Sequence, residues 1–250
     1  MESLKDKLCL VTGGTRGIGR AIAEMLLTQG ARVAICSRRQ ESVAQALAQL
    51  AHYGDKVKGK VADVSNSKEV GELFQFVDAE LGGLDVLVNN AGVGLFRPLA
   101  ELSLEQWRQT VETNLSGVFF CSRLAVPRLG TRGGGSIVNI SSLAGAHAFA
   151  GGAAYNASKF GLTGLSEAMM QDLRSENVRV SYVMPGSVAT GFGSDAASAS
   201  TGPGSDRPLG DGSSWKIWPE DVAEIVRMLL EMPARTLVSR VELRPARPKR

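Results

Sequence analysis

The sequence predicts an α/β fold in which a doubly wound parallel sheet of about seven strands carries helices on both faces. Short β-branched or apolar runs alternate with longer segments of helical periodicity along the chain. The strand-like runs are apolar without a polar alternation, as in Val-Leu-Val at 86–88, which is typical of strands buried on both faces. A chain of 250 residues, 44% of them hydrophobic, can form this fold as one domain over residues 1–250.

The individual elements follow from local patterns. The expected strands are the β-branched runs at residues 8–11, 32–36, 57–62, 84–88, 136–140, 178–183 and 236–243. The expected helices are the amphipathic segments at residues 18–29, 41–51, 67–81, 104–129, 154–175 and 219–230. Ile22 and Leu26 share one side of the first helix, and Leu162 and Leu165 share one side of the fifth. Because strands and helices alternate, right-handed crossovers would bring the carboxyl ends of the strands to one edge, where ligands bind.

Composition excludes several classes of protein. The 28 basic and 25 acidic residues are mixed along the chain, so no nucleic-acid-binding face is expected, and the basic tail at 244–250 is interpreted as a solvated terminus. Cys9, Cys36 and Cys121 lie far apart in apolar surroundings, and with only two histidines we expect neither a disulfide nor a metal site. No uncharged apolar run could cross a bilayer, and residues 1–8 lack an apolar signal core. We therefore expect a cytoplasmic protein without a membrane partner.

A glycine-rich turn, Thr12-Gly13-Gly14-Thr15-Arg16-Gly17-Ile18-Gly19, follows the first strand and leads into the first helix. Gly13, Gly17 and Gly19 would let backbone N–H groups approach a pyrophosphate, and the helix N-terminus adds partial positive charge. The other cofactor contacts expected from this turn are Thr15, Arg16 and Ile18. Glycines alone would also fit an ordinary turn, but a turn between a strand and a helix indicates a dinucleotide-binding site.

The end of the second strand indicates which dinucleotide binds. An acidic residue there would hydrogen-bond the ribose 2′-hydroxyl of NAD. The sequence instead has Ser37 and Arg38, which can receive a 2′-phosphate, and Arg16 supplies a second cation. These positions predict NADP as the cofactor. The alternative is that Arg38 and Arg39 only begin a solvated helix.

Tyr155 and Lys159 lie four residues apart in an expected helix and therefore share one face. A phenol has a pKa of about 10 and is a weak acid–base group near neutrality. A nearby ammonium favours the phenolate and would lower that pKa, which would make the pair a tuned proton donor. The spacing alone is common, and a tyrosine packed under a lysine stem would also produce it.

Further polar residues fall where strands end. Ser142 follows the strand at 136–140, and Asn90 follows the strand at 84–88, so both would face the predicted ligand edge. Asn114 lies inside an otherwise apolar helix and needs hydrogen-bonding partners if it is buried. His147 would either line the substrate pocket or lie on an exposed loop.

Together these motifs resemble a short-chain dehydrogenase/reductase in its common single-domain form, which implies a Rossmann-type sheet. The matching motifs appear in family order over roughly residues 5–190 and are highly specific as a set. They are Thr12-Gly13-x3-Gly17-x-Gly19, Asp63-Val64, Asn89-Asn90-Ala91-Gly92, Asn114, Ser142, Tyr155-x3-Lys159 and Pro185-Gly186-x-Val188-x-Thr190.

The resemblance implies a role for each matched residue. Tyr155 would be the general acid/base, and Ser142 would polarise the substrate carbonyl. Lys159 would lower the pKa of Tyr155 and bind the nicotinamide ribose. Asn114 would hold a water in the proton relay. The other implied cofactor contacts are Asp63 and Val64 at the adenine, Asn90 near the ribose, Pro185, and Val188 and Thr190 at the nicotinamide carboxamide.

The function implied is an NADP(H)-dependent oxidoreductase that interconverts a carbonyl and an alcohol of a small molecule by hydride transfer. One alternative is a 3-oxoacyl thioester reductase of the same family. Another is a non-catalytic cofactor-binding sensor, which would not need the set Asn114, Ser142, Tyr155 and Lys159. A homo-oligomer is also implied, as a dimer or a tetramer. The ending at 241–250 lacks the Asp-Gly-Gly-like sequence that packs across a tetramer interface in many members, which argues against the usual tetramer and leaves a dimer through the long helix and the Tyr155 helix as the alternative.

Residues 191–214 interrupt the alternation of strands and helices. They are rich in Gly, Ser, Ala and Asp, and Phe192 and Leu209 are their only large hydrophobic residues. The conformational entropy lost when such a segment becomes ordered is hard to offset without a ligand. It begins beside Thr190 and ends at Trp215 and Trp218, which would anchor it, so we interpret it as a flexible lid over the substrate. The alternative is a passive disordered insertion.

Overall fold

The structure is a computed structural model that describes residues 2–192 and 215–247. Its strands pair in parallel in one sheet, in the order β3-β2-β1-β4-β5-β6-β7. The strands are β1 (Leu8–Thr12), β2 (Arg32–Ser37), β3 (Val57–Val61), β4 (Val86–Asn89), β5 (Gly135–Ile140), β6 (Val178–Pro185) and β7 (Arg240–Leu243). The helices are α1 (Gly17–Thr28), α2 (Gln40–Gln49), α3 (Ser67–Leu81), α4 (Leu104–Val111), α5 (Gly117–Thr131), α6 (Ala153–Asp172) and α7 (Pro219–Glu231). The predicted fold class is confirmed.

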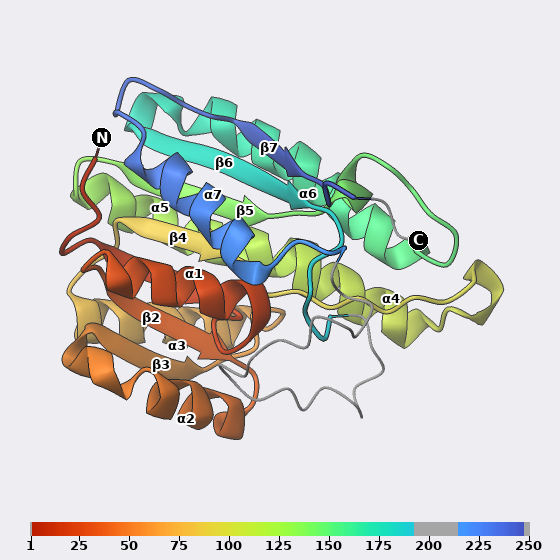
Figure 1. Cartoon of the computed structure of the whole chain (residues 1–250), viewed down its shortest axis with the longest axis horizontal. Helices are drawn as coiled ribbons and strands as arrows, with labels where there is room; N and C mark the ends of the chain where they lie inside the picture. The colour runs from red at the N-terminus through yellow and green to blue at the C-terminus, as the bar shows by residue number, and fades with distance from the viewer. Residues whose placement is uncertain (1, 193–214, 248–250) are drawn as a thin grey trace.

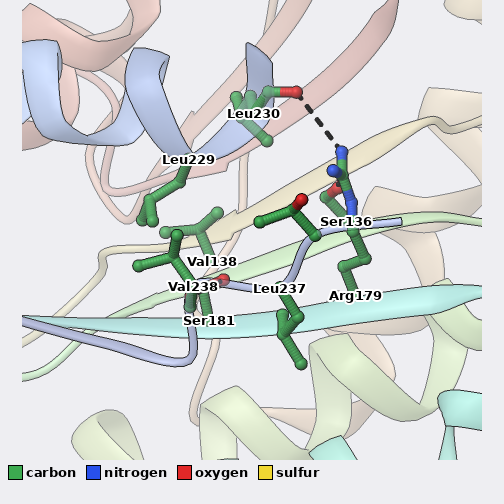
Figure 2. A pocket seen from close by; sticks show the side chains of 9 residues that line it. Ser136, Val138, Arg179, Ser181, Leu229, Leu230, Leu237 and Val238 are labelled. Atoms are coloured by element: carbon green, nitrogen blue, oxygen red, sulfur yellow. Dashed lines mark hydrogen bonds between the residues drawn. The ribbon is translucent and has the colours of Figure 1, made fainter. Parts of the chain in front are cut away.

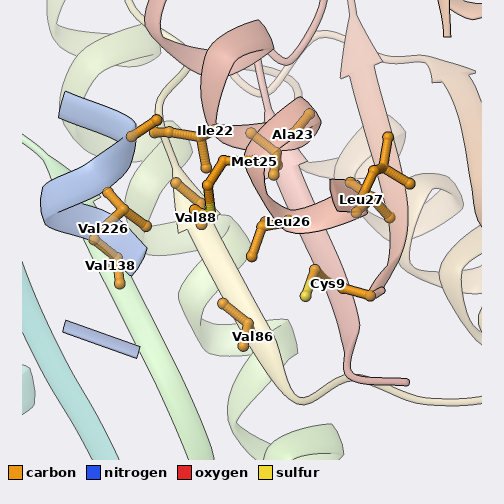
Figure 3. Close-up of a cluster of buried hydrophobic side chains, with 14 of the residues drawn as sticks. Cys9, Ile22, Ala23, Met25, Leu26, Leu27, Val86, Val88, Val138 and Val226 are labelled. Carbon is orange, nitrogen blue, oxygen red and sulfur yellow. The ribbon is translucent and has the colours of Figure 1, made fainter. Parts of the chain in front are cut away.

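Helices cover both faces of the sheet (Figure 1). Helices α1, α2 and α7 pack on one face, and α3, α5 and α6 pack on the other. On the first face, Ile22 of α1 and Val226 of α7 lie over Val88 of β4 and Val138 of β5 (Figure 3). Strands buried in this way on both sides need apolar residues at successive positions, which explains why uninterrupted apolar runs form strands in this chain.

The strand order reverses between β1 and β4. The chain runs from β1 outwards to β3, then crosses back to β4 and continues outwards to β7 on the other side. In doubly wound sheets a ligand binds at this reversal, outside the carboxyl ends of the strands. The loops after β1, β4, β5 and β6 therefore surround the expected site, and we call this side of the sheet the carboxyl edge.

One predicted helix is divided in two. The sequence predicts a continuous helix over residues 104–129, whereas the structure has α4, then a π-helical turn at Glu112–Ser116, and then α5. Such turns appear where a side chain must be placed off the regular helical face, often at functional sites. Here the turn carries Asn114. The last strand is also shorter than predicted and begins at Arg240.

Of the predicted lid at residues 191–214, the structure describes only Gly191 and Phe192, because residues 193–214 lie outside the described residues. After it, Ile217 pairs with the segment that follows β6, and Trp215 and Trp218 are half-buried. Within the described ranges, no helix combines the length and apolar character that a membrane crossing requires. The same ranges contain no cluster of side chains that could bind a metal ion. Cys9, Cys36 and Cys121 are buried free thiols, as the sequence predicts.

Candidate active site

Two glycines of the glycine-rich turn have backbone conformations that favour glycine. Gly13 and Gly17 have positive φ angles of 63° and 53°. A Cβ added at Gly13 would lie 2.9 Å from the Cα of Ala91, and a Cβ added at Gly17 would lie 3.2 Å from Cγ2 of Thr190. The glycines therefore allow the turn to pack closely against the segments after β4 and β6.

The N-terminus of α1 is suited to bind an anion. Arg16 occupies the N-cap position with an extended backbone, and its side chain makes no capping hydrogen bond. The first turn of α1, which the structure describes completely, contains no acidic residue. Its N–H groups and the helix dipole therefore present positive charge at the carboxyl edge, beside the half-buried Thr15 and Ile18. A dinucleotide pyrophosphate fits this helix end.

Asn90 connects the glycine-rich turn to the end of β4. Its side-chain amide donates hydrogen bonds to the carbonyl oxygens of Thr12 at 3.0 Å and Gly13 at 3.1 Å. The Thr12 hydroxyl oxygen in turn accepts from the backbone N–H groups of Asn90 at 3.0 Å and Ala91 at 3.1 Å. A Cβ at Gly19 would overlap the Asn90 amide. The turn is thus fixed in shape by the protein itself.

The end of β2 carries positive charge. Ser37 is half-buried, and Arg38 and Arg16 are exposed. Neither arginine has an ion-pair partner within the described residues. Cations without carboxylate partners at the end of β2 and in the glycine-rich turn are what a ribose 2′-phosphate would require, and an acidic residue that would repel it is absent from the Ser37–Arg38 position.

Asp63 and Val64 follow β3 in a tightly bonded loop. The Asp63 carboxylate accepts hydrogen bonds from the backbone N–H of Ser65 at 2.9 Å and from its hydroxyl at 2.7 Å. Val64 is buried against α5, where a Cβ on Gly117 would lie 2.9 Å from its Cγ2. The loop therefore forms a fixed border of the carboxyl edge, and its contact with the adenine stays a prediction.

The segment after β6 lies against the glycine-rich turn. Pro185 is buried at the end of β6, and Val188 forms a parallel bridge with Ile217. Thr190 follows, and its side chain packs against Gly17, where an added Cβ would lie 3.2 Å from Cγ2 of Thr190. The Pro185, Val188 and Thr190 positions thus bring the β6 segment to the turn where the cofactor is expected.

Ser142 and Tyr155 come together at the carboxyl edge. Ser142 lies directly after β5, and Tyr155 lies in the first turn of α6. The Ser142 hydroxyl lies close enough to the Tyr155 phenol to lower its pKa, and it accepts a hydrogen bond from the backbone N–H of Ala144 at 3.1 Å. The two hydroxyl groups that the sequence assigns to the substrate oxygen are therefore adjacent.

Lys159 shares the face of α6 with Tyr155, as predicted. Its ammonium nitrogen lies 5.8 Å from the centroid of the Tyr155 ring and donates a hydrogen bond of 2.9 Å to the Ile140 carbonyl. Burial lowers the pKa of Lys159 to about 8.

The predicted lowering of the Tyr155 pKa is wrong for this structure. Burial raises the pKa of Tyr155, and the hydrogen bond from Ser142 only partly offsets that rise. The reason is that burial disfavours a phenolate, while the Lys159 ammonium is directed at the Ile140 carbonyl. Tyr155 is therefore held in its protonated form near neutral pH.

Asn114 is completely buried in the π-helical turn. Its Oδ1 accepts from the backbone N–H of Val93 at 2.8 Å, and its Nδ2 donates to the Val93 carbonyl at 2.9 Å and to the Ser158 hydroxyl at 3.1 Å. The expectation that a buried Asn114 has partners is confirmed. The side chain joins the loop after β4 to α6, next to Tyr155.

Three phenylalanines near Tyr155 were not assigned to the site from the sequence. The Tyr155 ring centroid lies 5.4 Å from that of Phe96, 5.8 Å from that of Phe192 and 6.5 Å from that of Phe149. A signal was present, because each phenylalanine occurs in the loop after one of the strands β4, β5 and β6, whose carboxyl ends meet at the site. His147, by contrast, is exposed and contacts Arg244 at 3.2 Å.

A small cavity lies far from these residues (Figure 2). It is lined by Ser136 and Arg179 at the amino ends of β5 and β6, and Arg179 donates to the Leu230 carbonyl at 3.3 Å. Its volume of about 10 Å³ leaves room for no more than a single water. It is therefore not a candidate substrate site.

Comparisons with known proteins identify the family of this chain. Residues 7–200 match the family model described as short chain dehydrogenase. The chain is 38% identical over 189 residues to a 3alpha-hydroxysteroid dehydrogenase of Mediterraneibacter gnavus, covering 75% of this chain and 76% of that protein. It is 31% identical over 245 residues to an uncharacterized oxidoreductase of Staphylococcus aureus strain N315, covering 98% of this chain and 100% of that protein.

Solved structures give the same assignment. A metagenomic short-chain oxidoreductase in complex with NADP has a TM-score of 0.81 and 34% identity, with 99% of this chain and 100% of that chain covered. An alcohol dehydrogenase from the archaeon Thermococcus sibiricus, complexed with 5-hydroxy-NADP, has a TM-score of 0.84 and 30% identity, with 98% and 99% covered. The protein belongs to the short-chain dehydrogenase family.

Proposed function

We propose that this protein is an NADP(H)-dependent oxidoreductase that interconverts a carbonyl and an alcohol of a small-molecule substrate. The observation that carries the proposal is the adjacent pair of hydroxyl groups on Ser142 and Tyr155, with Lys159 on the same face of α6, beside a glycine-rich turn suited to a dinucleotide. When bound there, a nicotinamide dinucleotide supplies or accepts the hydride.

Each residue of the pair has a role that follows from its surroundings. Burial keeps the Tyr155 phenol protonated, so it can donate its proton to a carbonyl oxygen as that oxygen gains charge. The Ser142 hydroxyl holds the same oxygen by a second hydrogen bond. With its pKa of about 8, Lys159 is mostly cationic at neutral pH, and its proposed part is to bind the nicotinamide ribose beside Tyr155.

Asn114 supports this geometry through its hydrogen bonds to neighbouring segments. Because its side chain holds Val93 and Ser158, it sets the position of the loop after β4 relative to α6. Its part in a water-mediated proton relay belongs to the same proposal. The same proposal includes contacts with the adenine by Asp63 and Val64. It also includes contacts with the nicotinamide by Val188 and Thr190.

The preference for NADP rests on Arg38, Arg16 and Ser37, and the relatives that are bound to NADP-type cofactors support it. A hydrogen bond to a charged group contributes roughly 1.5–3 kcal/mol, and each 1.4 kcal/mol is about tenfold in binding. We expect Arg38→Ala to weaken NADPH binding by about 10- to 100-fold and to leave NADH binding nearly unchanged. Titration of both cofactors by fluorescence measures this. If both weakened equally, Arg38 would not contact the 2′-phosphate.

The direct test of the function is an initial-rate assay of NADPH oxidation with ketones, quinones, sugars and acyl thioesters. We expect turnover of at least one carbonyl class, with NADPH preferred over NADH. A thioester as the only substrate would support the 3-oxoacyl thioester reductase. Cofactor binding without turnover of any member of the panel would support the non-catalytic sensor instead.

We also propose that the whole chain acts as one domain in the cytoplasm and forms a homo-oligomer. The strands β1 to β7, which follow one another along the chain, all belong to a single sheet. Helices α4, α5 and α6 expose the large apolar side chains Leu104, Trp107, Phe119 and Phe160. A second copy of the chain would cover them.

Light scattering of the purified protein tests the oligomer. We expect a mass of two or four times the 26.4 kDa of one chain. A mass of 26.4 kDa that does not change with protein concentration would contradict the proposal.

A further inference from the structure

Three phenylalanine rings form what we call the aromatic wall of the site: Phe96, Phe149 and Phe192. They come from the loops after β4, β5 and β6 and surround the ring of Tyr155. Phe96 meets Tyr155 edge-on, with ring planes 85° apart, and it meets Phe149 at 5.6 Å and 66°. A substrate whose oxygen reaches the Tyr155 phenol would therefore meet these rings with its other atoms.

The loops hold Phe96 and Phe149 in place. The backbone of the Phe96 loop pairs with the Phe149 loop, through the N–H of Arg97 and the carbonyl of Gly151 at 2.9 Å. The Phe149 N–H donates to Oδ1 of Asn156 at 3.3 Å. The Asn156 amide itself donates to the Ala144 carbonyl at 2.8 Å and is buried. The wall is therefore a built feature and not a chance contact of surface side chains.

Phe192 is held in a similar way. Its N–H donates to the Thr190 hydroxyl at 3.3 Å, and Thr190 packs against the glycine-rich turn. Gly94 makes room for two members of the wall, because a Cβ there would lie 2.6 Å from Cε1 of Phe192 and 2.9 Å from Cζ of Phe96. Any larger residue at 94 would force these rings apart.

The wall keeps apolar surface available to a ligand. The exposed fractions of the side chains are 46% for Phe149 and 45% for Phe192. Large apolar side chains exposed together beside reactive groups mark a binding surface. Aromatic rings in this arrangement prefer another aromatic ring, because the positive edge of one ring is attracted to the negative face of the next.

We propose that the substrates of this site are aryl ketones, or the corresponding aryl alcohols, whose ring packs against Phe149 and Phe192 while the oxygen binds Ser142 and Tyr155. This inference rests on the proposed function. It makes Phe96, Phe149 and Phe192 determinants of specificity and assigns them no part in proton transfer.

Two methyl ketones that share a carbon skeleton test the inference. Acetophenone and cyclohexyl methyl ketone differ in whether the six-membered ring is aromatic. An aromatic contact between rings changes binding by about two- to tenfold. We expect kcat/KM to favour acetophenone by at least that factor, mainly through KM. Phe149→Leu and Phe192→Leu, which keep apolar side chains at these positions, should each reduce the preference by about two- to tenfold.

Phe76→Leu is the matched control, because Phe76 is half-buried on α3 and lies outside both the wall and the surface that a second copy would cover. It should leave the preference between the two ketones unchanged. Equal kcat/KM for both ketones, or a preference that survives both wall substitutions, would overturn this inference while the proposed function stands. Reduction of neither ketone nor of any other carbonyl compound would instead overturn the proposed function, and this inference with it.

Discussion

Replacing Tyr155 by phenylalanine is expected to lower kcat/KM for carbonyl reduction by about 10²-fold or more, the lower end for loss of a general acid. The substitution removes the hydroxyl beside Ser142 and keeps the ring that packs against Phe96 and Phe192. NADPH affinity should barely change, because the glycine-rich turn and Arg38 are untouched. Steady-state kinetics and a fluorescence titration of the same protein preparation measure both quantities.

Tyr182→Phe is the matched control. Tyr182 is also buried, but its hydroxyl donates to Glu167 at 2.8 Å, away from Ser142. Loss of this hydrogen bond should change the free energy of unfolding and leave kcat/KM close to that of the parent. Parental turnover by the Tyr155→Phe variant would show that another group supplies the proton.

Gly19→Ala is expected to lower both the stability of the protein and its affinity for NADPH. The added Cβ would overlap the Asn90 amide and the Gly13 carbonyl, so the contact between the turn and the end of β4 must open. Overpacking of this kind destabilises a protein by about 1–3 kcal/mol. We also expect NADPH affinity to fall by more than about tenfold, because the N–H groups that face the pyrophosphate would move. Denaturant unfolding and cofactor titration give the two values.

Gly71→Ala provides the comparison, because Gly71 lies in the interior of α3 with nothing within 4 Å of an added Cβ. It should stabilise the protein by roughly 0.5–1 kcal/mol, as alanine does in place of glycine in a helix. Cofactor affinity should stay at the parental value. If both substitutions behaved alike, the close packing at Gly19 would not be what shapes the turn.

Most of the fold could be predicted from the sequence because burial on both faces of the sheet leaves a strong local pattern. Residues 8–11 in β1 and 86–88 in β4 are apolar at successive positions, and the intervening helices have clear periodicity. The division between α4 and α5 could not be predicted in the same way. It depends on Asn114 reaching Val93, which is a contact between segments far apart in the sequence. Helical periodicity contains no information about such a partner.

The candidate site was predictable in its motifs and less so in its electrostatics. The motifs place Ser142 beside Tyr155 because strand ends converge at one edge. The direction of the Tyr155 pKa depends on how deeply the phenol is buried and on where the Lys159 ammonium points, and neither follows from spacing. The aromatic wall was missed because its members share no motif. Only the fold brings Phe96, Phe149 and Phe192 together.

The most direct test of the central proposal is the transfer of a labelled hydride. The protein is incubated with NADPH deuterated at C4 of the nicotinamide, on each face in turn, together with a ketone that it reduces, and the alcohol is analysed by mass spectrometry. We expect one of the two labelled cofactors to place deuterium on the carbinol carbon, and the Tyr155→Phe variant to form far less of the labelled alcohol. An alcohol that carries no deuterium from either cofactor, or consumption of NADPH without formation of an alcohol, would contradict hydride transfer at this site.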